Sequence, residues 1–144
     1  MEPYRTVLAV LAVLPAAAVD VTPECIGCIC VATSGCNLSP GLNASGALGP
    51  FGITLPYFED ARIGDEPDFS DETHESCAGD PFCAALTIRK YMERNARDCD
   101  GDDRLTCADF ARIHRYGAPD CSLTADTSGY WRRFQDCVQI YTSA

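Results

Sequence analysis

Positive charge is scarce in this chain. Of its 144 residues, 11 are Lys or Arg and 21 are Asp or Glu, which gives a formal net charge of -10 with neutral histidines. Nucleic acids, anionic membrane surfaces and the anionic polymers of bacterial walls bind best to basic protein surfaces. The charge balance therefore argues against these partners, and it leaves neutral sugars open as ligands.

Residues that commonly bind metal ions are also few or badly spaced. The chain has only two histidines, His74 and His114, and no second paired-cysteine motif follows Cys25-x-x-Cys28, so a zinc site is disfavoured. The acids of residues 59–80 and 98–103 do not follow the spacing of an EF-hand loop. We expect no metal ion and no cofactor.

Ionisable side chains are missing from one long stretch. No Asp, Glu, His, Lys or Arg occurs between Cys25 and Phe58. General acid and base catalysis depends on a side chain that can give up or accept a proton near neutral pH. This stretch cannot supply one.

Cysteine, in contrast, is abundant. Ten cysteines in a chain of this length predict a disulfide framework, formed in an oxidising compartment. The even number allows five bridges, and the sequence leaves their pairing open. The cysteines are Cys25, Cys28, Cys30, Cys36, Cys77, Cys83, Cys99, Cys107, Cys121 and Cys137.

The first residues have the pattern of a secretory signal peptide. Arg5 belongs to a short polar start, residues 6–15 form an apolar run, and residues 16–18 are small. We predict cleavage after Ala18, which leaves residues 19–144 as one secreted domain. The apolar run is too short to span a bilayer and no second run follows, so we expect no membrane insertion.

Helical periodicity dominates the predicted domain. Cys25, Cys28, Ile29 and Ala32 share one face of a helix that begins after Thr22 and ends near residues 33–35. Further helices are predicted over residues 56–62, 81–97 and 106–116, and from residue 127 or 128 onward. Residues 51–55 alternate like a short strand, and the acidic stretch 59–80 is predicted to be mainly a solvated loop.

Two glycosylation triplets lie in the loop that follows the first helix. They begin at Asn37 and Asn43, and each has a serine two residues later. In a secreted chain such a loop is open to glycosylation. We expect at least one of the two asparagines to carry a glycan.

Taken together, these motifs resemble the invertebrate-type lysozymes, the family that includes leech destabilase. The resemblance runs from about Cys25 to Cys137 and implies a compact, disulfide-stapled lysozyme-like fold. This fold is α+β but mainly helical, with a small β element and a cleft between that element and the first helix. The motifs are Cys-x-x-Cys-x-Cys-x5-Cys, Gly49-Pro-Phe-Gly-Ile53, Tyr57-Phe-Glu-Asp-Ala61, Cys83-Ala84, Tyr91-Met92, Asp98-Cys99, Thr106 to His114, Cys121 and Tyr130-Trp131.

The resemblance also implies a catalytic pair that this sequence lacks. Active members carry their general acid, a glutamate, directly before Ser-Gly-Cys, where this chain has Thr33. Their second carboxylate, an aspartate, lies in the loop before the Gly-Pro-Phe segment; here the loop has no acid, and Asn43 is the nearest amide. Two cysteines usual around this loop are missing as well, with Leu48 in the place of one.

A threonine cannot replace the missing glutamate. Glycosidases need one protonated carboxylic acid for the leaving oxygen and one carboxylate as nucleophile or base. A hydroxyl has far too high a pKa to protonate the leaving group near neutral pH, and it cannot stabilise an oxocarbenium ion as an anion does.

Three hypotheses on function follow. The leading one is a secreted lysozyme-like protein that has lost muramidase chemistry and acts in defence or digestion as an interaction module or as a module that binds peptidoglycan or another saccharide. The second is an active peptidoglycan glycosidase that uses Glu59 or Asp60. The third is an isopeptidase that uses Ser34 and His114, because destabilase is credited with that activity; a core role suits His114 better.

Overall fold

The computed structural model describes residues 18–39, 41–122 and 128–143. The predicted signal peptide lies outside these residues, except for Ala18. Among the described residues, no helix has both the length and the apolar character needed to cross a membrane. The described helices are α1 (Pro23–Ser34), α2 (Leu55–Ala61), η1 (Ile63–Asp65), η2 (Pro67–Phe69), α3 (His74–Gly79), α4 (Pro81–Asn95), α5 (Cys107–Tyr116), η3 (Ala118–Asp120) and α6 (Tyr130–Thr142).

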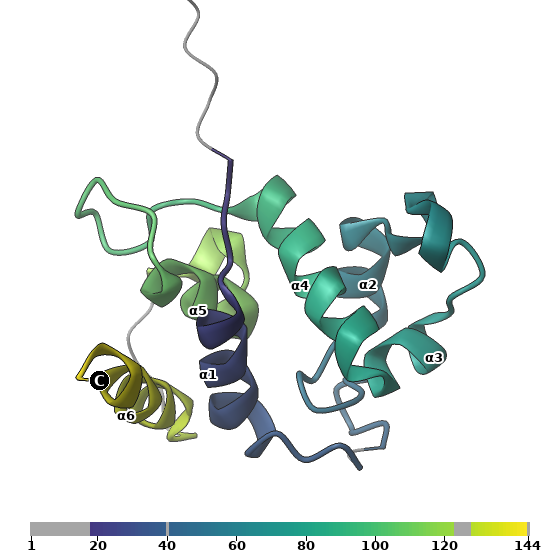
Figure 1. Cartoon of the computed structure of the whole chain (residues 1–144), viewed down its shortest axis with the longest axis horizontal. Coiled ribbons are helices and arrows are strands. Elements are labelled where there is room, and N and C mark those ends of the chain that lie inside the picture. The colour runs from purple at the N-terminus through teal and green to yellow at the C-terminus, as the bar shows by residue number, and fades with distance from the viewer. Residues whose placement is uncertain (1–17, 40, 123–127, 144) are drawn as a thin grey trace, which may run out of the picture.

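The fold is mainly helical, as the sequence predicts, and its helices form two groups. In Figure 1, α1, α5 and α6 lie together, while α2 and α3 pack beside α4. Apolar side chains from both groups meet in one core; its largest fully buried members include Ile29, Ile88, Met92 and Tyr130. The two groups therefore share a single core.

Helix α1 begins and ends where its sequence predicts. The Thr22 hydroxyl accepts a hydrogen bond from Cys25 N, and Pro23 occupies the first turn, where its missing N–H costs nothing. Gly35 ends the helix in the left-handed conformation; its N–H donates to the Val31 carbonyl, and the N–H of Cys36 donates to the Cys30 carbonyl. The predicted inner face of the helix is buried.

Five disulfides join these elements, as the cysteine count predicts. Two of them fasten α1 to α5 and to α6, and a third closes the turn after α1. The fourth joins α3 to α4, and the fifth links the segment before α5 to the end of η3. The pairs are Cys25–Cys107, Cys28–Cys137, Cys30–Cys36, Cys77–Cys83 and Cys99–Cys121.

The acidic stretch 59–80 is more ordered than predicted. It forms the end of α2, then η1, η2 and α3, and in this respect the prediction of a solvated loop is wrong. The reason is the apolar residues between the acids: Ile63 and Cys77 are fully buried in a small second cluster. Thr73 and Ser76 also form a capping box that starts α3.

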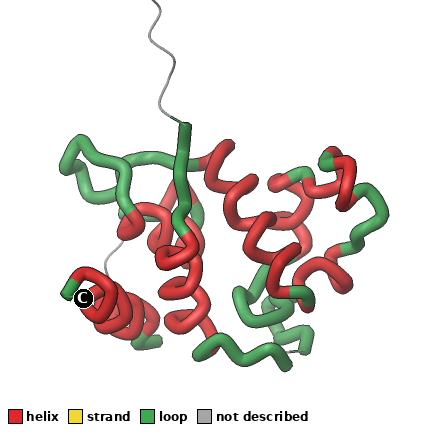
Figure 2. The backbone as a smooth tube through the Cα atoms, in the orientation of Figure 1, coloured by secondary structure: helices red, strands yellow, loops and turns green. Residues whose placement is uncertain are grey.

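The predicted strand is reduced to one antiparallel bridge between Leu48 and Ile53, and the tube in Figure 2 has no strand in the described chain. Each of these residues donates a backbone hydrogen bond to the other, at 3.0 and 2.9 Å. Buried His74 donates through Nε2 to the Ile53 carbonyl at 2.7 Å. The bridge and α3 are thereby held together.

The last helix begins slightly later than predicted. Gly129, in the left-handed conformation, precedes its first residue, Tyr130, whose N–H donates to the Ser128 hydroxyl at 3.3 Å. Residue 127, the other predicted cap, lies outside the described residues.

Gly49 tests how tightly the bridge is packed on α3. Its φ is 73°, and a Cβ placed on it would overlap the Ala78 carbonyl oxygen. Gly46 has a similar φ of 79° but nothing near its Cβ position. Replacing either glycine with alanine costs about 1–2 kcal/mol, because a residue with a Cβ is disfavoured in the left-handed conformation.

We expect Gly49→Ala to reduce the free energy of unfolding by about 2 kcal/mol more than Gly46→Ala, because only Gly49→Ala forces backbone apart in a packed region. Denaturant unfolding of the two variants measures the difference. Equal losses would contradict the close packing of the bridge on α3.

Candidate functional site

A cleft of about 660 Å³ opens where α1 ends, beside the Leu48–Ile53 bridge. This is the place that the resemblance implies. Its walls come from the last turn of α1, the loop after it, α2, α4 and the end of α5. The residues that bear on its chemistry are Thr33, Asn43, Tyr57, Asp60, His114 and Arg115.

Thr33, at the position of the expected general acid, lines the cleft from the last turn of α1. Its hydroxyl donates to the carbonyl of Ile29, one turn back, at 2.8 Å. Its methyl group faces Gly52 across the cleft wall, where a Cβ would contact it at 3.4 Å. The residue is thus satisfied within its own helix and brings no acid to the cleft.

Asn43 lines the same cleft from the loop. Its Oδ1 accepts hydrogen bonds from the Ser45 N–H at 3.0 Å, the Ser45 hydroxyl at 2.7 Å and the Ala47 N–H at 2.9 Å. The fold therefore brings Thr33 and Asn43 to one cavity, and both are neutral.

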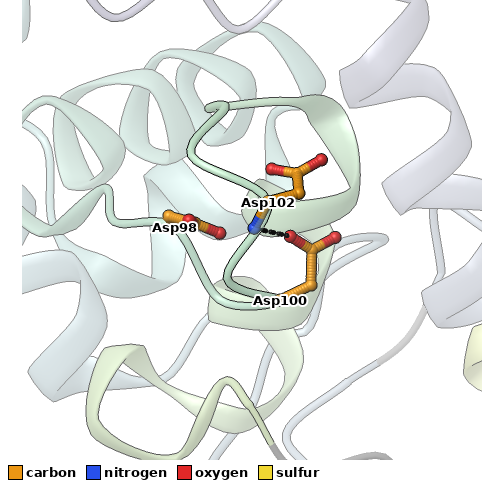
Figure 3. A group of neighbouring side chains, drawn as sticks. All are labelled: Asp98, Asp100 and Asp102. Atoms are coloured by element: carbon orange, nitrogen blue, oxygen red, sulfur yellow. Dashed lines mark hydrogen bonds between the residues drawn. The ribbon is translucent and has the colours of Figure 1, made fainter.

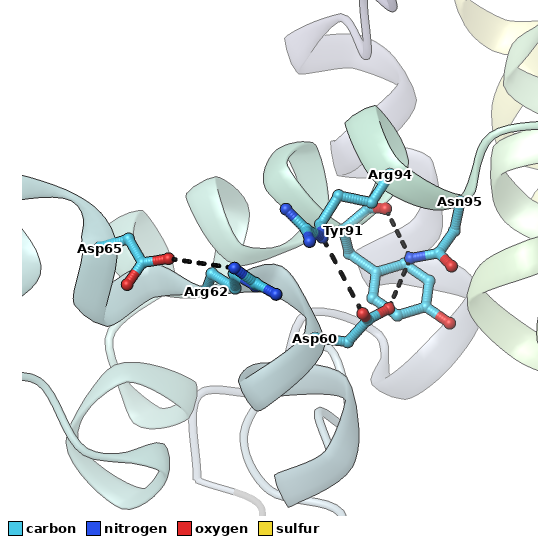
Figure 4. Close-up of polar contacts among 6 residues, drawn as sticks. All are labelled: Asp60, Arg62, Asp65, Tyr91, Arg94 and Asn95. Carbon is cyan, nitrogen blue, oxygen red and sulfur yellow. Dashed lines mark hydrogen bonds and ion pairs between the residues drawn. The ribbon is translucent and has the colours of Figure 1, made fainter.

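Of the two proposed substitute acids, only Asp60 lines the cleft. Asn95 donates to its Oδ2 at 2.7 Å, and Arg94 Nε lies 4.0 Å from its Oδ1; Figure 4 shows both partners reaching Asp60 from α4. Glu59 borders a different hollow, with Arg62. The described lining of the cleft therefore holds one carboxylate, and this carboxylate already has two polar partners.

Ser34 and His114 are not bonded to each other. The Ser34 hydroxyl donates to the Pro50 carbonyl at 2.6 Å and accepts from Asn37 N at 3.2 Å. The ring of His114 contacts the Phe51 carbonyl at 2.8 Å. The arrangement does not form the serine–histidine contact that a nucleophilic pair needs.

His114 instead forms an uncharged network with Tyr57. Because a carbonyl only accepts, Nε2 carries the proton donated to Phe51, and Nδ1 accepts the Tyr57 hydroxyl at 3.0 Å. The Tyr57 ring stacks on Tyr91 with centroids 3.7 Å apart. Burial raises the pKa of Tyr57 well above its usual value, so the phenol stays protonated.

Burial, opposed by the hydrogen bond to Phe51 and aided by the nearby Arg115, lowers the pKa of His114 to about 4. The imidazole is therefore neutral at physiological pH. Tyr57 and Tyr91 are not among the site residues predicted from the sequence. Their only signal was their place in the resemblance motifs, because their contact with His114 joins segments far apart in the chain.

A separate group of acids lies outside the cleft. Asp98, Asp100 and Asp102 place carboxylate oxygens within 4.8 Å of one another around one turn (Figure 3), and these are the described side chains best placed to hold a cation. Asp98 accepts backbone hydrogen bonds from Gly101 and Asp103, both at 2.8 Å. The bond from Asp103 is the main cause of a lowered pKa of Asp98. These bonds shape the turn itself.

The neutral histidine gives the fold a pH dependence. An unfolded histidine has a pKa near 6.5, so between about pH 4 and 6.5 the unfolded chain binds more protons at His114 than the folded chain. Its contribution to stability is complete above pH 6.5 and is lost as the pH falls toward 4, by at most about 3.5 kcal/mol at 1.4 kcal/mol per pH unit.

We expect His114→Gln to flatten the fall of unfolding free energy between pH 6.5 and 4, because glutamine keeps a donor for Phe51 and cannot be charged. Denaturant unfolding across this range, for both proteins, isolates His114 because the carboxylates titrate equally in each. The same slope in both proteins would contradict the assignment.

Known proteins resemble this chain over most of its length. The sequence model of the Destabilase family matches residues 22–137. Invertebrate-type lysozyme 3 of Caenorhabditis elegans is 34% identical over 123 residues, covering 79% of this chain and 84% of the relative. The lysozyme of Meretrix lusoria is 35% identical over 120 residues, covering 80% and 88%.

A solved structure agrees. The complex of Aeromonas hydrophila PliI with Meretrix lusoria lysozyme superposes with a TM-score of 0.63 at 32% identity, covering 80% of this chain and 88% of that one. Another inhibitor-bound structure of the same lysozyme gives a TM-score of 0.62. The chain therefore belongs to the Destabilase family and is a relative of the invertebrate-type lysozymes.

Proposed function

We propose that this protein is a secreted, lysozyme-like protein that binds saccharide chains in its cleft without cleaving them. The observation that carries the proposal is the single carboxylate of the described cleft lining, Asp60. Both mechanisms of glycoside hydrolysis need two carboxyl groups across the scissile bond. Thr33, where the resemblance places the general acid, and the loop that holds Asn43, where it places the second carboxylate, supply none.

The cleft keeps features that suit sugar binding. Tyr57 and Tyr91 contribute aromatic groups, and Asn43, Ser45 and Thr54 contribute amide and hydroxyl groups. Apolar and aromatic walls with a few polar groups are typical of ligand sites. Because the relatives are named lysozymes, peptidoglycan fragments are the first ligands to test, in a role in defence or digestion.

Secretion and glycosylation are part of the same proposal. All ten cysteines are paired, which suits an oxidising compartment. Asn37 and Asn43 are both exposed, so both triplets are accessible to a glycosyltransferase. A glycan on Asn43 would stand at the edge of the cleft.

The first test is wall binding without lysis. We expect purified protein to sediment with insoluble peptidoglycan, while the turbidity of a bacterial wall suspension falls no faster than with heat-inactivated protein. Clearing above that control would overturn the proposal. If the Asp60→Asn substitution abolished this clearing, the protein would be a glycosidase that uses Asp60.

The second test installs the missing acids. We expect Thr33→Glu together with Asn43→Asp to gain wall hydrolysis at least about 100-fold above background, since general acid–base groups contribute about 10²–10⁴-fold. An aspartate at 43 can accept the same three hydrogen bonds as Asn43 Oδ1. Thr33→Glu alone should restore little, because the second carboxylate is still absent.

Thr33→Gln with Asn43→Gln is the matched control for the second test, because it adds similar bulk and removes the same glycosylation triplet but adds no carboxyl group. Equal wall hydrolysis by the Thr33→Glu, Asn43→Asp variant and the Thr33→Gln, Asn43→Gln variant would show that the two positions do not form the catalytic pair.

A further inference from the structure

We propose that the saccharide bound by this cleft carries a carboxylate, and that the guanidinium of Arg115 binds it. This rests on the proposed function and specifies its ligand. The juxtaposition behind it is an arginine with no acidic partner among the described residues, in a cleft whose described lining has one carboxylate, Asp60, which already has polar partners.

The two charged side chains that line the cleft differ in their surroundings. Asp60 accepts a hydrogen bond from Asn95 at 2.7 Å and has Arg94 within 4.0 Å. The protein already compensates much of its negative charge. A ligand therefore meets little uncompensated negative charge at this end of the cleft.

Arg115 has no such compensation. Within the described chain, no Asp or Glu oxygen lies within 4.0 Å of its guanidinium. Its guanidinium carbon lies 5.6 Å from the centroid of the buried Tyr130 ring, which supports the side chain, and the residue is exposed. The donors of the guanidinium are available to a ligand at the end of α5.

Within the cleft, contacts run from Arg115 to Asp60. Arg115 directly follows His114 in α5, and His114 bonds to Tyr57. Tyr57 stacks on Tyr91, and Asn95 donates to both the Tyr91 carbonyl and Asp60. The groups between the two charges are neutral. The net unmet charge of the cleft is therefore positive and sits at the Arg115 end.

A basic residue in the last turn of a helix also has a structural explanation, because it interacts favourably with the helix dipole. The interaction with the helix dipole uses the positive charge of Arg115 but does not use the planar N–H donors of its guanidinium. A carboxylate would match them with two parallel hydrogen bonds. Lysine at this position would keep the dipole interaction and lose the two-point match, so it separates the two roles.

The negative charge of the whole protein narrows the ligand further. At a net charge of -10, a polyanion is repelled by the surface as a whole. At physiological salt, exposed charges act over only about 8 Å, so a single carboxylate near Arg115 responds mainly to that arginine. The expected ligand is a mostly neutral sugar chain with separated carboxylates.

The test is calorimetric binding of tetrasaccharides to the purified protein. One probe alternates N-acetylglucosamine with N-acetylmuramic acid and has free carboxylates; its carboxamide derivative and chitotetraose are neutral. A hyaluronan tetrasaccharide offers uronic acids instead and distinguishes the source of the carboxylate. We expect the free acid to bind about tenfold more tightly than its carboxamide, as for a charge-assisted pair.

Arg115→Gln should remove this preference, so that the free acid and its carboxamide bind equally tightly. Arg115→Lys should keep the fold and part of the preference. The matched control is Arg132→Gln, which removes an exposed arginine outside the cleft and should keep the full tenfold preference. Thermal unfolding of each variant shows whether it is folded.

The outcomes separate this inference from the proposed function. If wild-type protein binds acid and amide equally, or if folded Arg115→Gln keeps the preference, the role of Arg115 is refuted and saccharide binding stands. If wild-type protein binds none of the four probes, both proposals fail. Tighter binding of hyaluronan than of the muramic acid probe would support Arg115 and move the ligand class to uronic acid chains.

Discussion

Two disulfides that leave successive turns of α1 hold the cleft in place. Cys25–Cys107 fixes α1 to α5 and Cys28–Cys137 fixes it to α6, as the neighbouring helices in Figure 1 show. Each bond closes a long loop, for which chain-entropy estimates give roughly 4–5 kcal/mol. Arg133 reinforces the joint with two hydrogen bonds to the Ala32 carbonyl, at 3.0 and 2.8 Å. The ends of α1 and α5, which form two walls of the cleft, are thereby fixed relative to each other.

Within this frame several uncharged polar side chains of the cleft have hydrogen-bond partners inside the protein, while Asp60 and Arg115 supply the charges of its described lining. Thr33 bonds back to its own helix, Asn43 caps its own loop, and His114 donates to the Phe51 carbonyl and accepts from the Tyr57 hydroxyl. None of these residues needs a catalytic carboxylate as a partner. The scaffold can therefore stay stable without carboxylates at these positions, because packing and disulfides carry the fold and a few lining residues determine the chemistry of the site.

The parts of the fold that sequence predicts best are those fixed by local contacts. The caps at Thr22, Asp80 and Thr106 bond within three residues, so α1, α4 and α5 follow from spacing alone. The bridge does not, because its alternating pattern is interrupted by glycines with positive φ. The disulfide pairing and the Tyr57–His114 contact join segments that are distant in the sequence, so local sequence patterns cannot predict them. The placement of Thr33 in the cleft was predictable from the resemblance, and the role of Arg115 was not.

The most direct measurement of the central claim is the fate of one oligosaccharide held in the wild-type cleft. A chitohexaose incubated for days with the protein can be followed by mass spectrometry for its length and by NMR for shifts in the Tyr57 and Tyr91 rings. If the cleft binds saccharides without cleaving them, we expect shifted tyrosine signals and an intact hexasaccharide. Shorter products that accumulate faster than in a protein-free blank would contradict it.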